Sequence, residues 1–168
     1  MGMNNNGSPH VREMTIHDIP GVKEVIASSA PYVSLRTDSD YWLYAQLFRN
    51  TCLCLEVCHR LCGVAISFLD QTDNLRQMYI QDFAIVPGFR GRGHGSRLME
   101  ATLERARSIG VKRVWLTSDI DNAAALALWK RHGFVNLKSD YRRDGYWITR
   151  NLKGPGKDRV VLEKHLAT

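Results

Sequence analysis

Long apolar segments are missing from this sequence of 168 residues. No run of apolar residues approaches the roughly 20 that a membrane-spanning helix needs. The first residues, MGMNNNGSPH, lack the apolar core of a secretory signal, and Asn6 stands where a myristoylation signal has Ser or Thr. We therefore expect a cytoplasmic protein without a membrane partner, in which residues 1–9 form a disordered tail.

Paired C-x2-C motifs are also missing, although the four cysteines are crowded into one stretch. Cys52, Cys54, Cys58 and Cys62 follow a C-x-C-x3-C-x3-C spacing within apolar, strand-like sequence. Structural zinc sites typically use paired knuckles, so we expect no metal here. We expect four small buried side chains on two adjacent strands, in a reducing compartment.

Internal repeats and long linkers are absent, and the length suits one domain, which we place at residues 10–168. The charge is not balanced: 23 Lys and Arg face 17 Asp and Glu, a formal net charge of +6. Such an excess favours a polyanionic partner, which can be nucleic acid, membrane or a phosphate-bearing cofactor. The arginines concentrate at one loop and no nucleic-acid motif accompanies them, so we expect no nucleic-acid partner.

Hydrophobic periodicity and turn residues predict alternating strands and helices. The predicted helices cover 15–30, 38–50, 96–110 and 122–133, and the predicted strands cover 10–15, 52–58, 62–69, 79–86, 111–119, 141–149 and 160–166, the last two as an antiparallel pair. The order strand, helix, strand, helix over 79–133 implies a parallel crossover between hairpins. We therefore predict an α/β fold with a mixed, mostly antiparallel twisted sheet and helices on both faces.

The loop in FRGRGHGSRLMEA, residues 89–101, combines bare backbone with positive charge. It follows a predicted strand and opens a predicted helix, where unpaired N–H groups and the helix dipole attract anions. Its glycines permit close approach of a ligand, and its arginines pair well with phosphate. Neither G-x-x-x-x-G-K-[ST] nor G-x-G-x-x-G is present, so the pattern indicates another carrier of a pyrophosphate, or else a glycine turn with solvated arginines.

Two motifs resemble those of the GNAT acetyltransferases. Arg90-Gly91-Arg92-Gly93-His94-Gly95 resembles their R/Q-x-x-G-x-G/A signature, and residues 122–134, from Asn122 to Phe134, resemble their N-x-x-A-x-x-L-Y-x-x-x-G-F element. The resemblance covers about residues 10–165 and is weakest in the first 75, where the acceptor is usually chosen. It implies the GNAT acyl-CoA N-acyltransferase fold, with a fourth strand near 78–86 that splays from a fifth near 112–118.

The resemblance also implies a site for acetyl-CoA (coenzyme A) between these two strands. The diphosphate would lie on the amides of the loop, and the pantetheine would pair with the strand backbone as an added strand does. An amide near Phe83 or Ala84 would polarise the thioester. The expected cofactor-binding residues are Phe83, Ala84, Ile85, Arg90, Gly91, Arg92, Gly93, His94, Gly95, Ser96, Asn122 and Trp129. Asn122 is equally well explained as a helix cap, and Trp129 as a core residue.

The expected catalytic residues depart from the family in two ways. The strand MYIQDFAIV resembles that of the spermidine/spermine acetyltransferases, but Gln81 replaces their glutamate and cannot act as a base. The base role then passes to Asp82, which can equally be a structural salt-bridge partner. Neighbours on a regular strand face opposite ways, so only one of Gln81 and Asp82 can face the acceptor.

The second departure is Trp129, which occupies the position of the tyrosine that protonates the leaving thiolate in many GNAT enzymes. Tyr79 is the substitute acid that we select, with His132, Tyr141 and Tyr146 as alternatives. The resemblance implies direct transfer of an acetyl group to a primary amine of a small molecule or peptide. The alternative is a module that binds acyl-CoA with little catalysis. A homodimer is left open.

Overall fold

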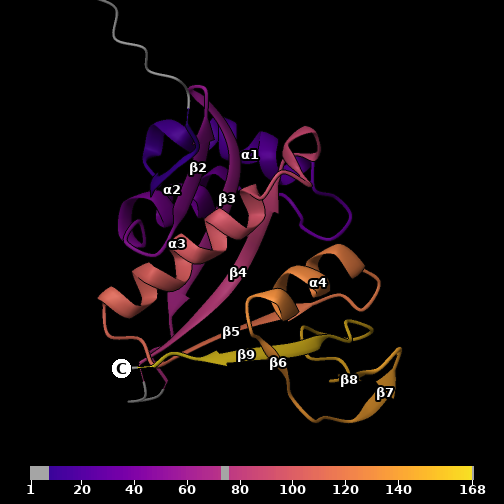
Figure 1. Cartoon of the computed structure of the whole chain (residues 1–168). Coiled ribbons are helices and arrows are strands. Elements are labelled where there is room, and N and C mark those ends of the chain that lie inside the picture. Colours follow the sequence, from indigo (N-terminus) through magenta and orange to yellow (C-terminus); the bar gives the residue numbers. More distant parts are fainter. Residues whose placement is uncertain (1–7, 73–75, 168) are drawn as a thin grey trace, which may run out of the picture. The chain divides into compact units, whose positions relative to one another are not determined.

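The computed structural model describes residues 8–72 and 76–167 of the chain (Figure 1). Most of the tail predicted at residues 1–9 therefore lies outside the described residues. The helices are α1 (Ile19–Ala27), α2 (Asp38–Leu47), α3 (His94–Ser108) and α4 (Ala123–Arg131), with short 3₁₀ turns at Ile16–Asp18 and Pro87–Phe89. The strands are β1 (His10–Glu13), β2 (Leu53–Val57), β3 (Arg60–Leu69), β4 (Gln77–Ile85), β5 (Arg113–Ser118), β6 (Val135–Asn136), β7 (Tyr141–Arg143), β8 (Tyr146–Ile148) and β9 (Val160–His165).

The chain divides into two units, and each is described by itself. The first contains Met1–Ser67 and Asp82–Thr102, and the second contains Phe68–Gln81 and Leu103–Thr168. The prediction of a single domain over residues 10–168 remains a prediction.

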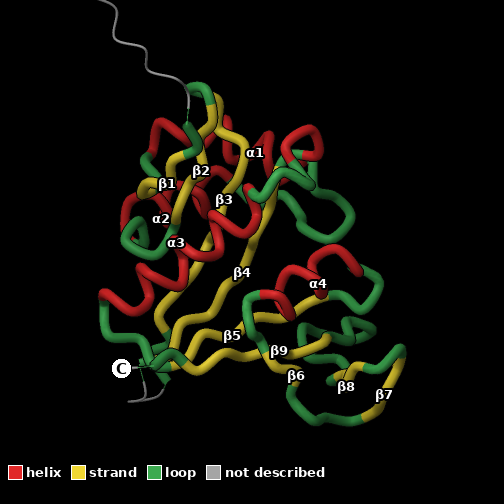
Figure 2. The backbone as a smooth tube through the Cα atoms, viewed as in Figure 1, coloured by secondary structure: helices red, strands yellow, loops and turns green. Residues whose placement is uncertain are grey.

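The first unit contains β1, β2, most of β3 and the last four residues of β4, in the sheet order β1-β2-β3-β4 (Figure 2). The pairs β1–β2 and β2–β3 are antiparallel. One face of these strands packs against α3, where Leu98 is fully buried in a cluster with Leu55 and Ile85. The helix α1 buries Val22, Val25 and Ile26, the apolar face expected from the sequence.

The cysteines of the first unit are free thiols and differ in exposure. Cys52, Cys54 and Cys62 are buried, but Cys58 is exposed. The expectation of four buried side chains is therefore wrong for Cys58, which occupies the two-residue turn between β2 and β3 with His59. Burial raises the pKa of the Cys52 thiol to about 12 and that of Cys62 to about 11.

The second unit contains the first five residues of β4 with β5, β9 and β6, in the sheet order β4-β5-β9-β6. β4 and β5 are parallel from Gln77 to Ile80, which confirms the predicted crossover, while β9 pairs antiparallel with β5 and β6. Every second residue of β5 is buried, which is why this strand reads as alternating in the sequence.

The predicted pair of 141–149 with 160–166 is wrong. β7 pairs with β8 in a separate two-stranded hairpin, and β9 pairs with β5 and β6 instead. An isolated antiparallel bridge joins Thr149 to Arg159, the residue before the second predicted segment. The cause is local, because Asp144-Gly145 is a turn dipeptide that reverses the chain between β7 and β8.

The predicted fold class is confirmed, because the architecture is α/β with a mixed, mostly antiparallel sheet and four helices among the described residues. No helix in the described part of the chain has the length and hydrophobicity that crossing a membrane requires.

Candidate functional site

The loop between β4 and α3, in the first unit, contains two glycines with left-handed backbone conformation. Gly91 and Gly93 have φ angles of 71° and 81°, a left-handed conformation that costs other residues free energy. A Cβ added at either position would meet no atom within 4 Å, so both backbones border open space.

The amides at the start of α3 are oriented as a helix N-terminus requires. The Arg97 amide donates to the Gly93 carbonyl at 3.0 Å, which is a backbone bond of the first turn. The amides that precede it belong to the group that a helix leaves without intrahelical partners. Together with the helix dipole, these amides create an anion-binding position.

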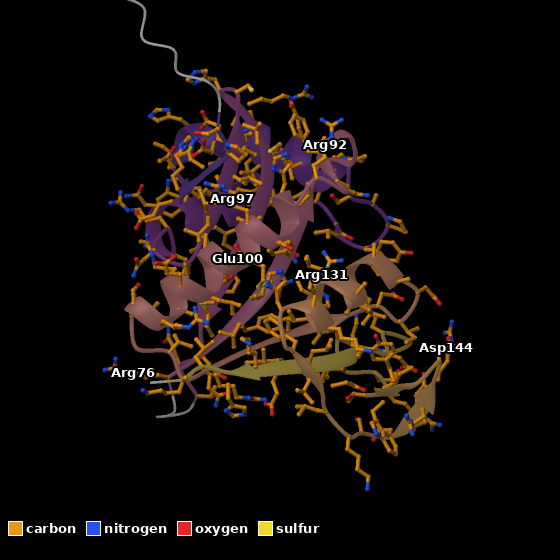
Figure 3. The ribbon with its side chains drawn as sticks, viewed as in Figure 1. Arg76, Arg92, Arg97, Glu100, Arg131 and Asp144 are labelled. Carbon is orange, nitrogen blue, oxygen red and sulfur yellow. The ribbon has the colours of Figure 1, made fainter. Side chains whose placement is uncertain are left out.

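The arginines of the loop do not behave alike. The Arg90 guanidinium points back into the first unit, where Nε donates to the Ile85 carbonyl at 2.7 Å and Nη2 to Ser29 Oγ at 3.3 Å. Its amide donates to the Pro87 carbonyl at 3.1 Å. Arg92 in the loop and Arg97 on α3 are exposed (Figure 3). All three arginines are exposed, but among them only Arg90 uses its guanidinium in the hydrogen bonds named above.

Two further groups flank the loop. The His94 ring lies 6.0 Å from the Phe89 ring, measured between centroids. The guanidinium of Arg60, at the start of β3, lies 5.7 Å from the centroid of the same Phe89 ring. Arg60 therefore adds positive charge beside the loop, and nothing in the sequence between positions 60 and 89 signals this pairing.

The side chains of β4 alternate between two faces. Asp82 and Ala84 are buried on one face, while Gln81 and Phe83 are half-buried on the other. Phe83 packs against the apolar cluster that contains Leu98 of α3. Asp82 and Gln81 therefore face opposite ways, as expected for a regular strand.

Asp82 forms an ion pair with Arg36, which confirms the expected alternative of a structural salt-bridge partner, although the sequence did not indicate which residue the partner is. Both of its carboxylate oxygens accept hydrogen bonds from Arg36, one from Nε and one from Nη2, each at 3.2 Å. The Asp82 side chain is 5% exposed and the Arg36 side chain 31%. Burial opposes the shift, but the hydrogen bond and charge of Asp82 raise the pKa of the Arg36 guanidinium. Because the partners are 46 residues apart, no periodicity reveals them.

The remaining predicted residues belong to the second unit. The Tyr79 hydroxyl lies 3.3 Å from the Thr117 hydroxyl, and Lys153 Nζ lies 5.0 Å from the centroid of the Tyr79 ring. Asn122 caps α4, because its Oδ1 accepts from the Ala125 amide at 3.2 Å. Trp129 is 5% exposed, with its ring edge-on to Phe134.

No group of three or more His, Cys, Asp or Glu side chains within the described ranges is arranged to hold a metal ion. The loop instead has features that proteins use to bind anions. It combines open backbone, a helix N-terminus and exposed guanidinium groups.

Comparison with known proteins gives three kinds of match. Residues 22–134 match the model of the acetyltransferase (GNAT) family. The L-2,4-diaminobutyric acid acetyltransferase of Vibrio parahaemolyticus is 32% identical over 127 residues, which cover 74% of this chain and 68% of that protein. The N-alpha-acetyltransferase 30 of Schizosaccharomyces pombe is 36% identical over 64 residues, which cover 38% of this chain and 43% of that protein.

Among solved structures, the diaminobutyrate acetyltransferase EctA of Paenibacillus lautus, in complex with L-2,4-diaminobutyric acid and coenzyme A, superimposes with a TM-score of 0.75. The match covers 96% of this chain and 98% of that chain at 16% identity. At this identity the likeness shows the fold.

Proposed function

Because this chain belongs to the acetyltransferase (GNAT) family, we propose that it transfers an acetyl group from acetyl-CoA to a primary amine in a ternary complex. The observation that carries the proposal is the loop before α3, where two left-handed glycines leave the backbone open beside exposed arginines. A diphosphate fits such a position, because it needs several N–H donors and compensating positive charge.

The residues of this chain fit the cofactor in the following way. The backbone from Gly91 to Ser96 would hold the diphosphate, with Arg92 supplying charge. The side chain and amide of Arg90 are engaged within the first unit, so its contribution is to shape the loop. The β4 backbone at Phe83, Ala84 and Ile85 lies beyond the register that pairs with β5, which supports its assignment to the pantetheine arm.

Acetyl-CoA supplies an acetyl group activated as a thioester. The acceptor enters as a neutral amine; its nitrogen bonds to the acetyl carbon, the carbon–sulfur bond breaks, the nitrogen loses a proton and the thiolate gains one. The amide of Phe83 or Ala84 would donate to the carbonyl oxygen, and positioning would supply most of the acceleration.

The three catalytic candidates differ in their ability to donate or accept a proton. Tyr79 carries a hydroxyl that can deliver a proton to the thiolate. Gln81 can hold an amine or a water molecule but cannot accept a proton usefully. A base role for Asp82 requires it to release at least one of its two hydrogen bonds from Arg36.

The names of two relatives support a primary amine as the acceptor class. One relative is named for an amino acid, L-2,4-diaminobutyric acid, and another for N-alpha acetylation, and both names imply aliphatic primary amines. The similarity of β4 to the spermidine/spermine acetyltransferases stays a prediction, which places polyamines on the same list of acceptors.

The test is release of free thiol from acetyl-CoA, followed with a thiol-reactive dye across a panel of amines. The panel contains L-2,4-diaminobutyrate, spermidine and a short peptide with a free amino terminus. We expect thiol release that depends on one of these acceptors. Tight binding of acetyl-CoA without release for any amine would favour a binding module and overturn the proposal.

A further inference from the structure

The guanidinium of Arg36 is only partly used within the chain. A guanidinium has five N–H donors arranged along two edges, each of which can bind a carboxylate in a bidentate manner. Asp82 occupies the edge formed by Nε and Nη2. Within the part of the chain that the structure describes, no hydrogen bond or ion pair engages Nη1 of Arg36. The edge formed by Nη1 and Nη2 is therefore available.

The backbone around Arg36 is held in place before any ligand arrives. Its amide donates to the hydroxyl of Tyr41, a fully buried residue of α2, at 3.3 Å. The next residue, Thr37, forms a capping box with Asp40, in which the Asp40 amide donates to Thr37 Oγ1 and the Thr37 amide donates to the Asp40 carboxylate. Arg36 is thus held at its backbone amide by Tyr41 and at its guanidinium by Asp82. A side chain held in this way loses little conformational freedom when it binds a further group.

From this geometry we infer that Arg36 binds a carboxylate of the acceptor, so that the preferred acceptor is an amino acid with a primary amine to be acetylated. The inference rests on the proposed function, because it concerns the acceptor of that same site. Asp82, which holds Arg36, immediately precedes Phe83 and Ala84, whose amides we propose to contact the thioester. Arg36 is thus a specificity-determining residue, and Asp82 is its positioning residue.

The charges of Asp82 and Arg36 also limit the charge that the acceptor can carry. Asp82 and Arg36 neutralise each other, so this pair gives a simple diamine no net attraction. An acceptor carboxylate on the second edge of the guanidinium adds a negative charge close to Asp82. A second ammonium group on the acceptor itself compensates that charge, so a zwitterionic diamino acid suits the site better than a dicarboxylate.

The experiment compares two acceptors that differ by one carboxylate, L-2,4-diaminobutyrate and its decarboxylated counterpart 1,3-diaminopropane. We expect kcat/KM of the protein to be at least about 10-fold higher for the amino acid, the value of a charge-assisted hydrogen bond. Arg36→Gln should reduce kcat/KM for the amino acid about 10- to 100-fold, mainly through KM, and change it less than about 3-fold for the diamine. Arg36→Lys should recover part of the loss, because it keeps the charge without the bidentate edge.

The control is Arg49→Gln, which removes an exposed arginine of the same unit that pairs with Glu13 and should alter neither value. Equal activity with the two acceptors, or an equal loss with both in Arg36→Gln, would overturn the inference and leave the transferase activity standing. Absence of thiol release with every amine would overturn the proposed function instead. Calorimetric titration of both compounds into the protein and into Arg36→Lys would then test the carboxylate site. Equal affinities of the unaltered protein for L-2,4-diaminobutyrate and 1,3-diaminopropane would reject it.

Discussion

At the scale of single residues, backbone conformation defines the loop before α3 more than side-chain chemistry does. Gly91 and Gly93 occupy left-handed angles and border open space, so their hydrogen atoms matter for conformation and for ligand approach, not for packing. Gly88, in the preceding 3₁₀ turn, also borders open space but is absent from the left-handed positions. Comparing Gly88 with Gly93 therefore separates the effect of the left-handed conformation from the effect of adding a methyl group in open space.

We expect Gly93→Ala to reduce the free energy of unfolding by about 1–2 kcal/mol, the cost of a Cβ in the left-handed region. It should also weaken acetyl-CoA binding, because the new methyl group projects where the ligand would lie. Urea unfolding and calorimetric titration measure the two effects. Gly88→Ala is the matched control and should change stability by less than about 0.5 kcal/mol. Equal stability of the two variants would contradict the conformational argument.

A second residue-scale feature is the charge cluster around Arg12. Its guanidinium lies 2.7 Å from Asp18 and 3.0 Å from Glu56, and both carboxylates are mostly buried. Burial alone would raise the pKa of Asp18, but hydrogen bonds from Arg12 and Thr15 outweigh it and lower that pKa. Asp18 therefore binds a proton less readily in the folded chain than in the unfolded one.

This lowered pKa predicts acid sensitivity. The contribution of Asp18 to stability is fully present above the unfolded pKa of about 4 and is lost as the pH falls through the lower folded value. We expect the Asp18→Asn variant to be less stable at pH 7 and to lose less stability between pH 5 and pH 3, measured by urea midpoints. The control is Asp38→Asn, at a carboxylate that is 76% exposed in its pair with Lys23, and it should change stability at pH 7 by less than about 0.5 kcal/mol. Parallel profiles of Asp18→Asn and the unaltered protein would refute the assignment.

At the scale of elements, the residue that begins a helix can also be a candidate for ligand contact. Asn122 caps α4 through the Ala125 amide, which explains the start of the helix without any cofactor. The family resemblance assigns the same side chain to coenzyme A. The two roles need different atoms of the amide, because the cap uses only Oδ1 and leaves the NH₂ group to a ligand.

Two substitutions separate these roles. Asn122→Ala should destabilise the protein by about 1 kcal/mol through loss of the cap. Asn122→Ser retains a capping oxygen and should restore most of that stability. If the NH₂ group contacts the cofactor, Asn122→Ser should still bind acetyl-CoA more weakly than the unaltered protein. Unchanged affinity in calorimetric titration would leave the cap as the sole role.

At the scale of the whole molecule, the net charge of +6 favours an anionic ligand. The excess charge acts over long range and weakens with salt, whereas contacts at the loop act only at short range. A cofactor with several phosphates is attracted both by the net charge and by the contacts at the loop. Its affinity should therefore fall as the ionic strength rises, while the loop stays its binding position.

Acetyl-CoA at about 100 times its Kd should add about 2.7 kcal/mol to the free energy of unfolding. For a chain of this size, that corresponds to a rise in Tm of roughly 5–10 °C in a thermal-shift titration. Free coenzyme A should behave similarly, and ATP should act more weakly because it lacks the pantetheine arm. Arg92→Ala should diminish the shift and Arg49→Ala should not. An equal response to ATP, or an undiminished shift in Arg92→Ala, would contradict the placement of the diphosphate.

The sequence by itself determined the features that depend on neighbouring residues. The glycines of the loop, the apolar face of α1, the alternation along β4 and the Asn122 cap all follow from local conformational preferences, so their elements were predicted from the chain. The hairpin of β7 and β8 also has a local signal in the sequence, the Asp144-Gly145 turn, but the predicted strand pairing was wrong there.

Only the tertiary structure decided which distant side chains meet. The pairing of Arg36 with Asp82 and the hydrogen bond from Arg90 to Ser29 join residues far apart in the chain. The exposure of Cys58 depends on where its turn lies. The physical reason is that ion pairs and burial depend on distance in space, while sequence patterns report only the period of a strand or helix. The left-handed glycines of the loop were therefore predictable from the sequence, and the pairing on which we base the role of Arg36 was not.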